Sequence, residues 1–293
     1  MLFLSPLRYP GGKRKITNFI KLLYQSNDLL DGEYVEPYAG GASVALALLY
    51  DEYVRHIHIN DLDQGVYAFW HSALNETESL CRLINDTTVT MDTWHNQRQV
   101  QKDSSASLLE LGFSTFFLNR TNRSGIISGG VIGGKEQKGQ WKLDARYNKH
   151  ELVHRIEKIG RFKARISLYN MDAVTLITDL IPHLSERLLI YFDPPYYVKG
   201  QQLLYTNYYN PEDHKVVAKL IHTLERKWVV SYDDVPEIRA LYQEYRHLSY
   251  GLNYSAQDRY KGAEVMFFCK NLEIPEVNEP TKIKPRYLQY YLL

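Results

Sequence analysis

The tetrapeptide Asp193-Pro194-Pro195-Tyr196 combines a carboxylate, a rigid backbone corner and an aromatic ring. Two successive prolines fix two φ angles and remove two N–H donors, so the carbonyls beside them point outward with no strand to join. Such a corner suits an exocyclic amine on a flat base: Asp193 and the Pro194 carbonyl accept its two protons, and Tyr196 stacks on the ring. A strand-ending turn is the alternative interpretation, because turns also favour Asp and Pro.

The residues before this corner form a continuous apolar run from Leu188 to Phe192. A run of this length, bounded by prolines, predicts a buried strand of a parallel sheet that ends at Asp193. The carboxyl edge of such a sheet is where open α/β folds bind ligands. A second predicted strand, Trp228 to Asp233, offers Tyr232 as the opposite wall of a base pocket, although a core tyrosine is the simpler interpretation.

An earlier turn at residues 36–41, with the sequence Glu-Pro-Tyr-Ala-Gly-Gly, separates a short predicted strand from an Ala/Leu-rich helix. This pattern indicates the opening unit of a doubly wound α/β sheet, and its glycines let the backbone approach a ligand at the positive end of the helix. The next predicted strand closes on Asp61, about twenty residues later, where an acid can grip a ribose diol. Asp172, after a further strand, can accept from an adenine amino group. Helix capping is the alternative for both acids.

The N-terminal segment contains Pro10-Gly11-Gly12-Lys13, which predicts a tight turn leading into a basic helix start. Exposed backbone N–H groups in such a turn raise the question of a phosphate loop. The spacing G-x-x-x-x-G-K-[ST] is missing, so we exclude a nucleoside triphosphatase.

The alternation of strands and helices lapses in the middle of the chain and resumes after about residue 163. We therefore predict a catalytic domain of residues 1–62 and 164–293 and an inserted, mainly helical domain of residues 63–163. Within the insertion, we expect Ser104-Ser105 to cap a helix through Leu118, and Asn148 to start a second helix.

Basic residues are segregated, although the net charge of the chain is only +1. From Gly112 to Ala164 eleven Lys or Arg residues stand against four acids, and this stretch is also rich in glycine. Such segregation predicts a polyanion partner, and flexible backbone carrying Arg, Asn and Lys suits phosphates and base edges. Solvated faces and a disordered linker are the alternatives. The residues expected to contact nucleic acid are Arg120, Asn122, Arg123, Ser124, Lys135 and Lys138.

Several protein classes are excluded by composition. No stretch approaches the roughly 18 apolar residues of a membrane span, and a proline at position 6 interrupts the start too early for a signal peptide. Two cysteines, Cys81 and Cys269, are far apart and show no metal-ligand spacing. We expect a reduced, cytoplasmic protein without a disulfide framework or a metal.

Together these segments resemble one family, the Dam-like adenine-specific DNA methyltransferases of the α motif order. The family shows a proline-glycine-glycine-lysine segment, a glutamate-proline-aromatic glycine turn, an inserted target-recognition domain and then Asp-Pro-Pro-Tyr. Here the same order runs from Tyr9 to Tyr196 and the resemblance spans nearly the whole chain. It implies a Rossmann-like S-adenosylmethionine-dependent methyltransferase sheet, double-stranded DNA as partner, and in some members a cognate restriction endonuclease.

The resemblance also implies positions for the site residues. Those carried over to the S-adenosylmethionine site are Tyr9, Lys13, Glu36, Tyr38, Ala39, Gly40, Asp61, Asp172 and Asp193. The catalytic corner is Asp193, Pro194, Pro195 and Tyr196, and the flipped base is expected between Tyr196 and Tyr232. Bacterial or phage-encoded origin is implied as well.

The expected activity is site-specific methylation of adenine N6 in duplex DNA. Direct transfer needs no covalent intermediate, and neither cysteine follows a proline, which argues against methylation of cytosine C5. Cytosine N4, adenine in RNA and a protein glutamine remain alternative acceptors. A catalytically inactive DNA-binding relative is the alternative from a different class.

Overall fold

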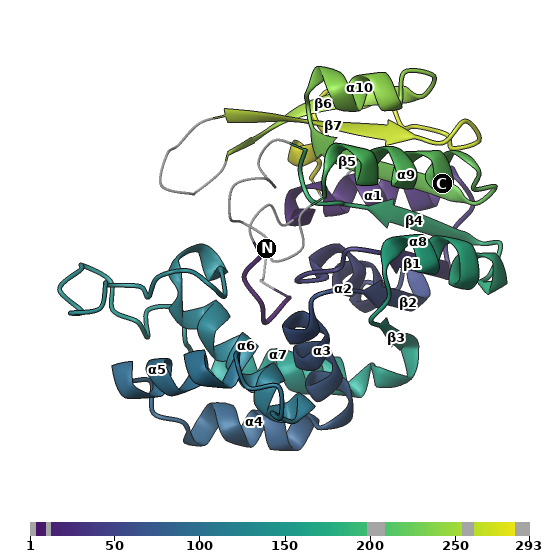
Figure 1. Cartoon of the computed structure of the whole chain (residues 1–293). Helices are drawn as coiled ribbons and strands as arrows, with labels where there is room; N and C mark the ends of the chain where they lie inside the picture. The colour runs from purple at the N-terminus through teal and green to yellow at the C-terminus, as the bar shows by residue number, and fades with distance from the viewer. Residues whose placement is uncertain (1–3, 10–12, 198–208, 254–260, 285–293) are drawn as a thin grey trace. The chain divides into compact units, whose positions relative to one another are not determined.

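The computed structural model describes residues 4–9, 13–197, 209–253 and 261–284. Two compact units divide the chain: the first comprises Met1–Gly12 and Asp63–Asn170, and the second comprises Lys13–Leu62 and Met171–Leu293 (Figure 1). Among the described residues, no helix combines the length and apolar character needed to cross a bilayer.

The strands form a mixed seven-stranded sheet in the order β3-β2-β1-β4-β5-β7-β6. Neighbouring strands among β2, β1, β4 and β5 run parallel, whereas β7 is antiparallel to both β5 and β6. This confirms the predicted α/β class. The strands are β1 (Gly32–Glu36), β2 (Val54–Asn60), β3 (Ile166–Tyr169), β4 (Leu188–Phe192), β5 (Lys227–Asp233), β6 (Arg246–Asn253) and β7 (Lys261–Phe268).

The direction of strand addition reverses between β1 and β4. From β1 the chain adds β2 on one side, and it later adds β4 and β5 on the other. Because crossover connections are right-handed, the helix after β1 and the helix after β4 lie on opposite faces of the sheet (Figure 1). Open α/β sheets usually bind ligands at such a reversal, outside the carboxyl ends of the strands, which here are β1 and β4.

Helices cover the sheet of the second unit. Strand β4 is buried along its whole length because all five of its residues are apolar or aromatic, as the sequence predicts. Helix α9 begins with Pro211 after the N-cap Asn210, whose side chain accepts from two backbone N–H groups. The helices are α1 (Thr17–Ser26), α2 (Ser43–Tyr50), α8 (Ala173–Thr175), α9 (Pro211–His222) and α10 (Pro236–Leu241), with the 3-10 turn η1 (Lys13–Ile16).

The first unit is mainly helical and is centred on α6. This helix is buried from Gly112 to Thr121, and a Cβ atom at Gly112 would lie 2.5 Å from the Ala68 carbonyl oxygen, so glycine permits close packing on α3. The helices are α3 (Gln64–Asn75), α4 (Thr77–Asp86), α5 (Met91–Val100), α6 (Leu108–Thr121) and α7 (Lys149–Arg161).

The predicted start of α6 is wrong by a few residues. Ser107, not Ser104-Ser105, is the N-cap, and it forms a capping box with Glu110. The signal was present in the sequence, because Ser-x-x-Glu before an apolar run is typical of a helix start. Asn148 caps α7 as predicted, by accepting from the Glu151 N–H.

Candidate active site

Strand β4 delivers Asp193 to the carboxyl edge of the sheet, where two side chains hold its carboxylate. Lys13, the first residue of η1, lies 2.8 Å from Oδ1 and donates to Oδ2 at 2.9 Å. The Ser231 hydroxyl of the neighbouring strand β5 donates to Oδ1 at 3.0 Å, and Tyr191 in turn contacts Ser231 at 2.7 Å. The acid is therefore fixed from two directions.

Tyr196 shares the same cation. The Lys13 ammonium lies 3.0 Å from the Tyr196 hydroxyl and 5.1 Å from the ring centroid. That hydroxyl donates to Glu264 of β7, which also accepts from Tyr250 at 2.7 Å. The Tyr196 side chain is consequently buried, with 4% of the residue exposed.

One cation, Lys13, faces two acids in this cluster. Burial alone would lower the pKa of Lys13, but the charges of Asp193 and Glu264 outweigh it and raise the pKa well above its usual value. Burial raises the pKa of Asp193, with Lys13 opposing and Glu264 adding to the shift. Of the three side chains, Glu264 and Lys13 are 0% and 4% exposed and Asp193 is 25% exposed. Only Asp193 in this trio can meet a ligand.

The turn between β1 and α2 is built from hydrogen bonds to two acids. Glu36 accepts from the Ala45 N–H at 3.2 Å and from the Tyr34 hydroxyl at 3.1 Å, and burial raises the pKa of Glu36 to about 8. Gly40 has a φ of +48°, and its N–H donates to Asp61 at 2.8 Å. Asp61 thus supports the glycine turn from the end of β2.

Asn60 links this turn to the segment that follows Asn170. Its side chain donates to the Pro37 carbonyl at 2.9 Å and exchanges two hydrogen bonds with the Met171 backbone. The next residue, Asp172, caps α8 through the Val174 N–H at 2.8 Å, so the capping interpretation of Asp172 is correct for this structure. Sequence reasoning missed Asn60, for which the only signal is an amide at the end of the strand that precedes Asp61.

Tyr232 lies in an aromatic cluster. It is fully buried in β5, and its hydroxyl contacts Nδ1 of His214 at 3.0 Å. The His214 ring packs against Tyr197 and Tyr209 as well, with centroids 5.2 and 5.4 Å away. Tyr209 also joins Tyr38 of the β1–α2 turn, through hydroxyls 2.9 Å apart.

The expected nucleic-acid contacts of the first unit divide into exposed and buried residues. Arg123, Lys135 and Lys138 are exposed and Ser124 is partly exposed. Arg120 is 8% exposed and Asn122 is completely buried. Asn122 accepts from the Trp94 indole at 2.7 Å and donates to the carbonyls of Ile126 and Ile127 at 2.9 Å, so its side chain fixes the loop after α6.

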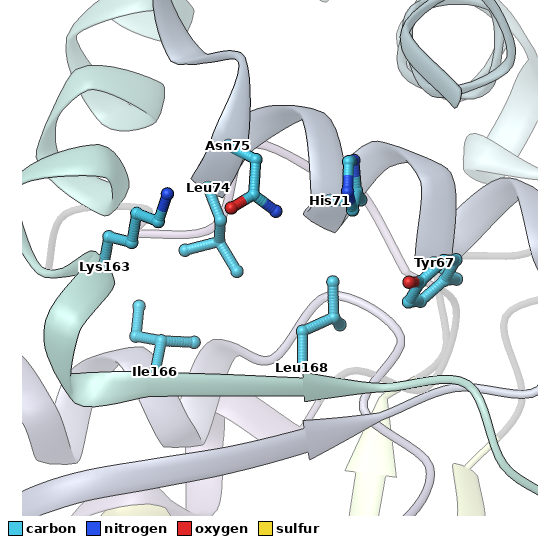
Figure 2. Close-up of a pocket in the computed structure, with 7 residues that line it drawn as sticks. All are labelled: Tyr67, His71, Leu74, Asn75, Lys163, Ile166 and Leu168. Atoms are coloured by element: carbon cyan, nitrogen blue, oxygen red, sulfur yellow. The ribbon is translucent and has the colours of Figure 1, made fainter. Parts of the chain in front are cut away.

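A separate pocket of about 230 Å³ lies in the first unit. Figure 2 shows side chains of α3 facing those of η3 (Lys163–Arg165) and β3 across it. No residue of its lining was predicted as a site residue, although Tyr67 and His71 share one helix face by their spacing. The lining consists of Tyr67, His71, Leu74, Asn75, Lys163, Ile166 and Leu168.

Tyr9 is partly exposed in the first unit, and Pro10-Gly11-Gly12 lies outside the described residues. The structure brings Lys13, Asp193 and Tyr196 together and places Glu36, Tyr38, Ala39, Gly40 and Asp61 on and beside one turn. It adds two residues that sequence reasoning did not single out, Ser231 and Glu264. A polar residue within an otherwise apolar strand is their only signal.

Similar proteins are distant in sequence. The rRNA methyltransferase aviRa from Streptomyces viridochromogenes is 12% identical over 90% of this chain and 87% of its own, with a TM-score of 0.38. Protein LPL1258 from Legionella pneumophila is 14% identical over 94% and 87%, with a TM-score of 0.35. These TM-scores are too low to support any conclusion, and no curated protein matches.

The family assignment is independent of these structures. The D12 class N6 adenine-specific DNA methyltransferases match residues 9–256, which include the turn after β1, the insertion and the Asp-Pro-Pro-Tyr corner. This is most of the chain, and it agrees with the family that the order of motifs indicates. The chain belongs to the D12 class N6 adenine-specific DNA methyltransferases.

Proposed function

We propose that this methyltransferase transfers a methyl group from S-adenosylmethionine to N6 of an adenine flipped out of duplex DNA. The observation that carries the proposal is the position of Asp193. Its carboxylate is the accessible member of a buried charge cluster, and it stands at the carboxyl end of β4 beside the reversal of strand order. Membership of the D12 class supplies the reaction type.

The turn after β1 fits the nucleoside cofactor. Gly40 adopts a left-handed conformation and, being glycine, has no Cβ atom to obstruct a ligand at the turn. Helix α2 begins just after the turn, and the N–H groups of its first turn can face the ligand. We assign Asp61 and Asp172 to the ribose and adenine parts, from their places after β2 and before α8. The other proposed cofactor residues are Tyr9, Lys13, Glu36, Tyr38 and Ala39. When bound, S-adenosylmethionine supplies an electrophilic methyl group on sulfur.

Asp193 and the Pro194 carbonyl accept the two hydrogens of the adenine amino group. Their acceptance turns the nitrogen lone pair out of conjugation with the ring, so that the nitrogen becomes nucleophilic. The new N–C bond forms as the sulfur–methyl bond breaks, and the leaving group is the neutral thioether S-adenosylhomocysteine. The amino group must then lose one proton, and the raised pKa of Asp193 suits that carboxylate to receive it. Lys13 holds the acid in place and remains protonated because its own pKa is raised.

Flipping an adenine out of the helix costs a few kcal/mol, which stacking and hydrogen bonds in the pocket must offset. Tyr196 is the proposed stacking partner. Since 4% of Tyr196 is exposed, stacking requires groups around this ring to move when DNA binds. Tyr232 supports the pocket from behind, through its contact with His214.

We assign target recognition to residues 63–163, which all belong to the first unit. Exposed Arg123, Lys135 and Lys138 carry charge on the glycine-rich loop, where they suit backbone phosphates. Asn122 acts by holding that loop in shape, because its three described side-chain hydrogen bonds are all to groups within the first unit.

The test is to offer the full chain methyl-labelled S-adenosylmethionine together with unmethylated duplex DNA, RNA or protein. We expect label in DNA alone. Label in RNA or in protein would support one of the alternative acceptors and overturn the proposal. Binding of DNA without transfer of label to any acceptor would indicate a catalytically inactive relative.

A further inference from the structure

Arg120, near the C-terminal end of α6, is a buried cation without a described hydrogen-bond partner. The residue is 8% exposed, and its Nε is buried and unpaired among the described residues. Burying a guanidinium is costly unless its N–H groups are satisfied, so such an arrangement calls for a ligand or for opposing charge.

The groups around Arg120 supply more positive charge. Burial, and then the charges of Arg155 and Arg8, lower the pKa of Arg120 to about 9. Burial and the charge of Arg146 also lower the pKa of Arg8. Glu151 is the acid that acts on Arg120, and it is already paired with Arg155. The cluster therefore carries an excess of positive charge.

The Tyr147 hydroxyl is a further polar group beside Arg120. Tyr147 is 6% exposed, its oxygen is buried and unpaired within the described part of the chain, and Arg120 acts on it electrostatically. A phenol donates one hydrogen bond and a guanidinium donates up to five. The available donors match the oxygens of a phosphate group, for which planar guanidinium groups are well suited.

The cluster is held by the fold and does not consist of loose surface side chains. Arg155 is 9% exposed and donates to the Ser5 carbonyl at 3.0 Å, and Arg8 donates to the Asn122 carbonyl at 3.1 Å. The side chain of Asn119 accepts from the Arg8 N–H and donates to the Arg8 carbonyl, both at 2.7 Å. All of these residues belong to the first unit.

We propose that Arg8, Arg120, Arg155 and Tyr147 form a built site for one phosphate group of the nucleic-acid backbone. The inference rests on the proposed function for the identity of the polymer, but not for the phosphate chemistry. Arg120 would then contact one backbone phosphate and would not read a base or lie free on the surface. Such a contact fixes the register of the protein on DNA without reading sequence.

The first experiment measures phosphate binding without DNA. The thermal midpoint of the full chain is recorded in sodium phosphate and in sodium chloride of equal ionic strength, for wild type, Arg120→Gln and Tyr147→Phe. Arg82→Gln, an exposed arginine on α4, is the matched control. General salt effects act on all four proteins alike.

We expect phosphate to raise the midpoint of wild type and Arg82→Gln more than that of Arg120→Gln or Tyr147→Phe. The Tyr147→Phe variant removes only an unpaired hydroxyl, so it keeps the test decisive if Arg120→Gln does not fold. Equal shifts in all proteins that fold would overturn the proposed site.

The second experiment measures how the affinity for duplex DNA depends on salt. Loss of one phosphate contact lowers the slope of log affinity against log salt by about 0.9. We expect this reduction for Arg120→Gln and for Arg8→Gln, and no larger reduction for the double variant, because both residues hold the same phosphate. A phosphate-specific midpoint shift with an unchanged slope would contradict the nucleic-acid assignment. A correct slope with methylation of a base other than adenine would refute the proposed function and leave this site standing.

Discussion

Two clusters of buried charge differ in how they are neutralised. In the second unit, Lys13 lies against Asp193 and Glu264, so one cation faces two acids within the protein itself. In the first unit, Arg120 lies in the fields of Arg8 and Arg155, with Glu151 the opposing acid. The Lys13 cluster contains its own counterions, whereas the Arg120 cluster has more cations than acids.

This difference suggests how the protein divides its work. A pre-formed pair of charges holds an acceptor in position for a neutral base, since little reorganisation is needed when the base arrives. An excess of buried positive charge instead gains stability when a polyanion binds. Catalysis and anchoring would then respond differently to mutation, to pH and to salt.

The largest expected effect comes from replacing Asp193, the accessible acid of the Lys13 cluster. Asp193→Asn keeps the shape of the side chain but removes an acceptor and the charge that pairs with Lys13. We expect the rate of methyl transfer in a single turnover to fall by about 10³-fold, equivalent to about 4 kcal/mol. Calorimetry should show that S-adenosylmethionine affinity is largely kept. Asp179→Asn, an exposed acid of the same unit, is the control, and comparable rates for both variants would refute the role of Asp193.

Lys13→Met tests whether the cation positions that acid. Removing Lys13 leaves Asp193 and Glu264 without their shared counterion, which we expect to lower the transfer rate by about 10²-fold, or about 2.7 kcal/mol. It should also raise the pKa of Asp193 further.

The ionised acid is needed for transfer, so the acidic limb of the pH-rate profile should move to higher pH in Lys13→Met. Lys13→Arg, which keeps the charge, should restore the position of that limb in part. A rate loss with an unshifted pH profile would show that Lys13 stabilises the fold but does not set the pKa of Asp193.

Asn122→Ala tests the loop that follows α6, next to the Arg120 cluster. The change leaves the Trp94 indole N–H and two backbone carbonyls without their partner inside the protein. We expect the free energy of unfolding to fall by about 2 kcal/mol in a urea titration. Asn85→Ala, on the exposed face of α4, should change it little. Equal stability of the two variants would show that Asn122 does not hold the loop.

The smallest effect is a pH dependence of stability in the second unit. Burial lowers the pKa of His214 to about 4, below the value of about 6.5 in an unfolded chain. The unfolded state therefore takes up more protons as the pH falls, and stability present above pH 6.5 is lost toward pH 4. We expect about 1 kcal/mol of this loss between pH 7 and 5.5. His214→Phe should remove it, and an unchanged pH dependence in that variant would contradict a neutral, buried His214.

The sequence was sufficient for the elements with strong local signals. Strand β4 follows from five apolar residues before two prolines, and α7 follows from a capping Asn148 and helical spacing. The order of motifs also identified the family, because their combination is far more specific than any one of them.

What the sequence did not reveal depends on contacts between distant residues. Lys13 and Ser231 contact Asp193 and Glu264 contacts Lys13, each from a separate segment, and no local pattern records that these residues converge. Arg120 resembles a surface cation in a basic stretch, yet α6 is buried around its C-terminal half. The aromatic residues on several faces of that helix were the only sign that it would be enclosed.

The measurement that tests the account most directly is the identity of the nucleoside that receives the methyl group. Unmethylated duplex DNA is incubated with the full chain and labelled S-adenosylmethionine, digested to nucleosides and separated. We expect the label to co-elute with N6-methyl-2′-deoxyadenosine and to be lost when Asp193→Asn replaces the wild type. Label in N4-methylcytosine, or label in N6-methyladenine that persists undiminished in the variant, would contradict it.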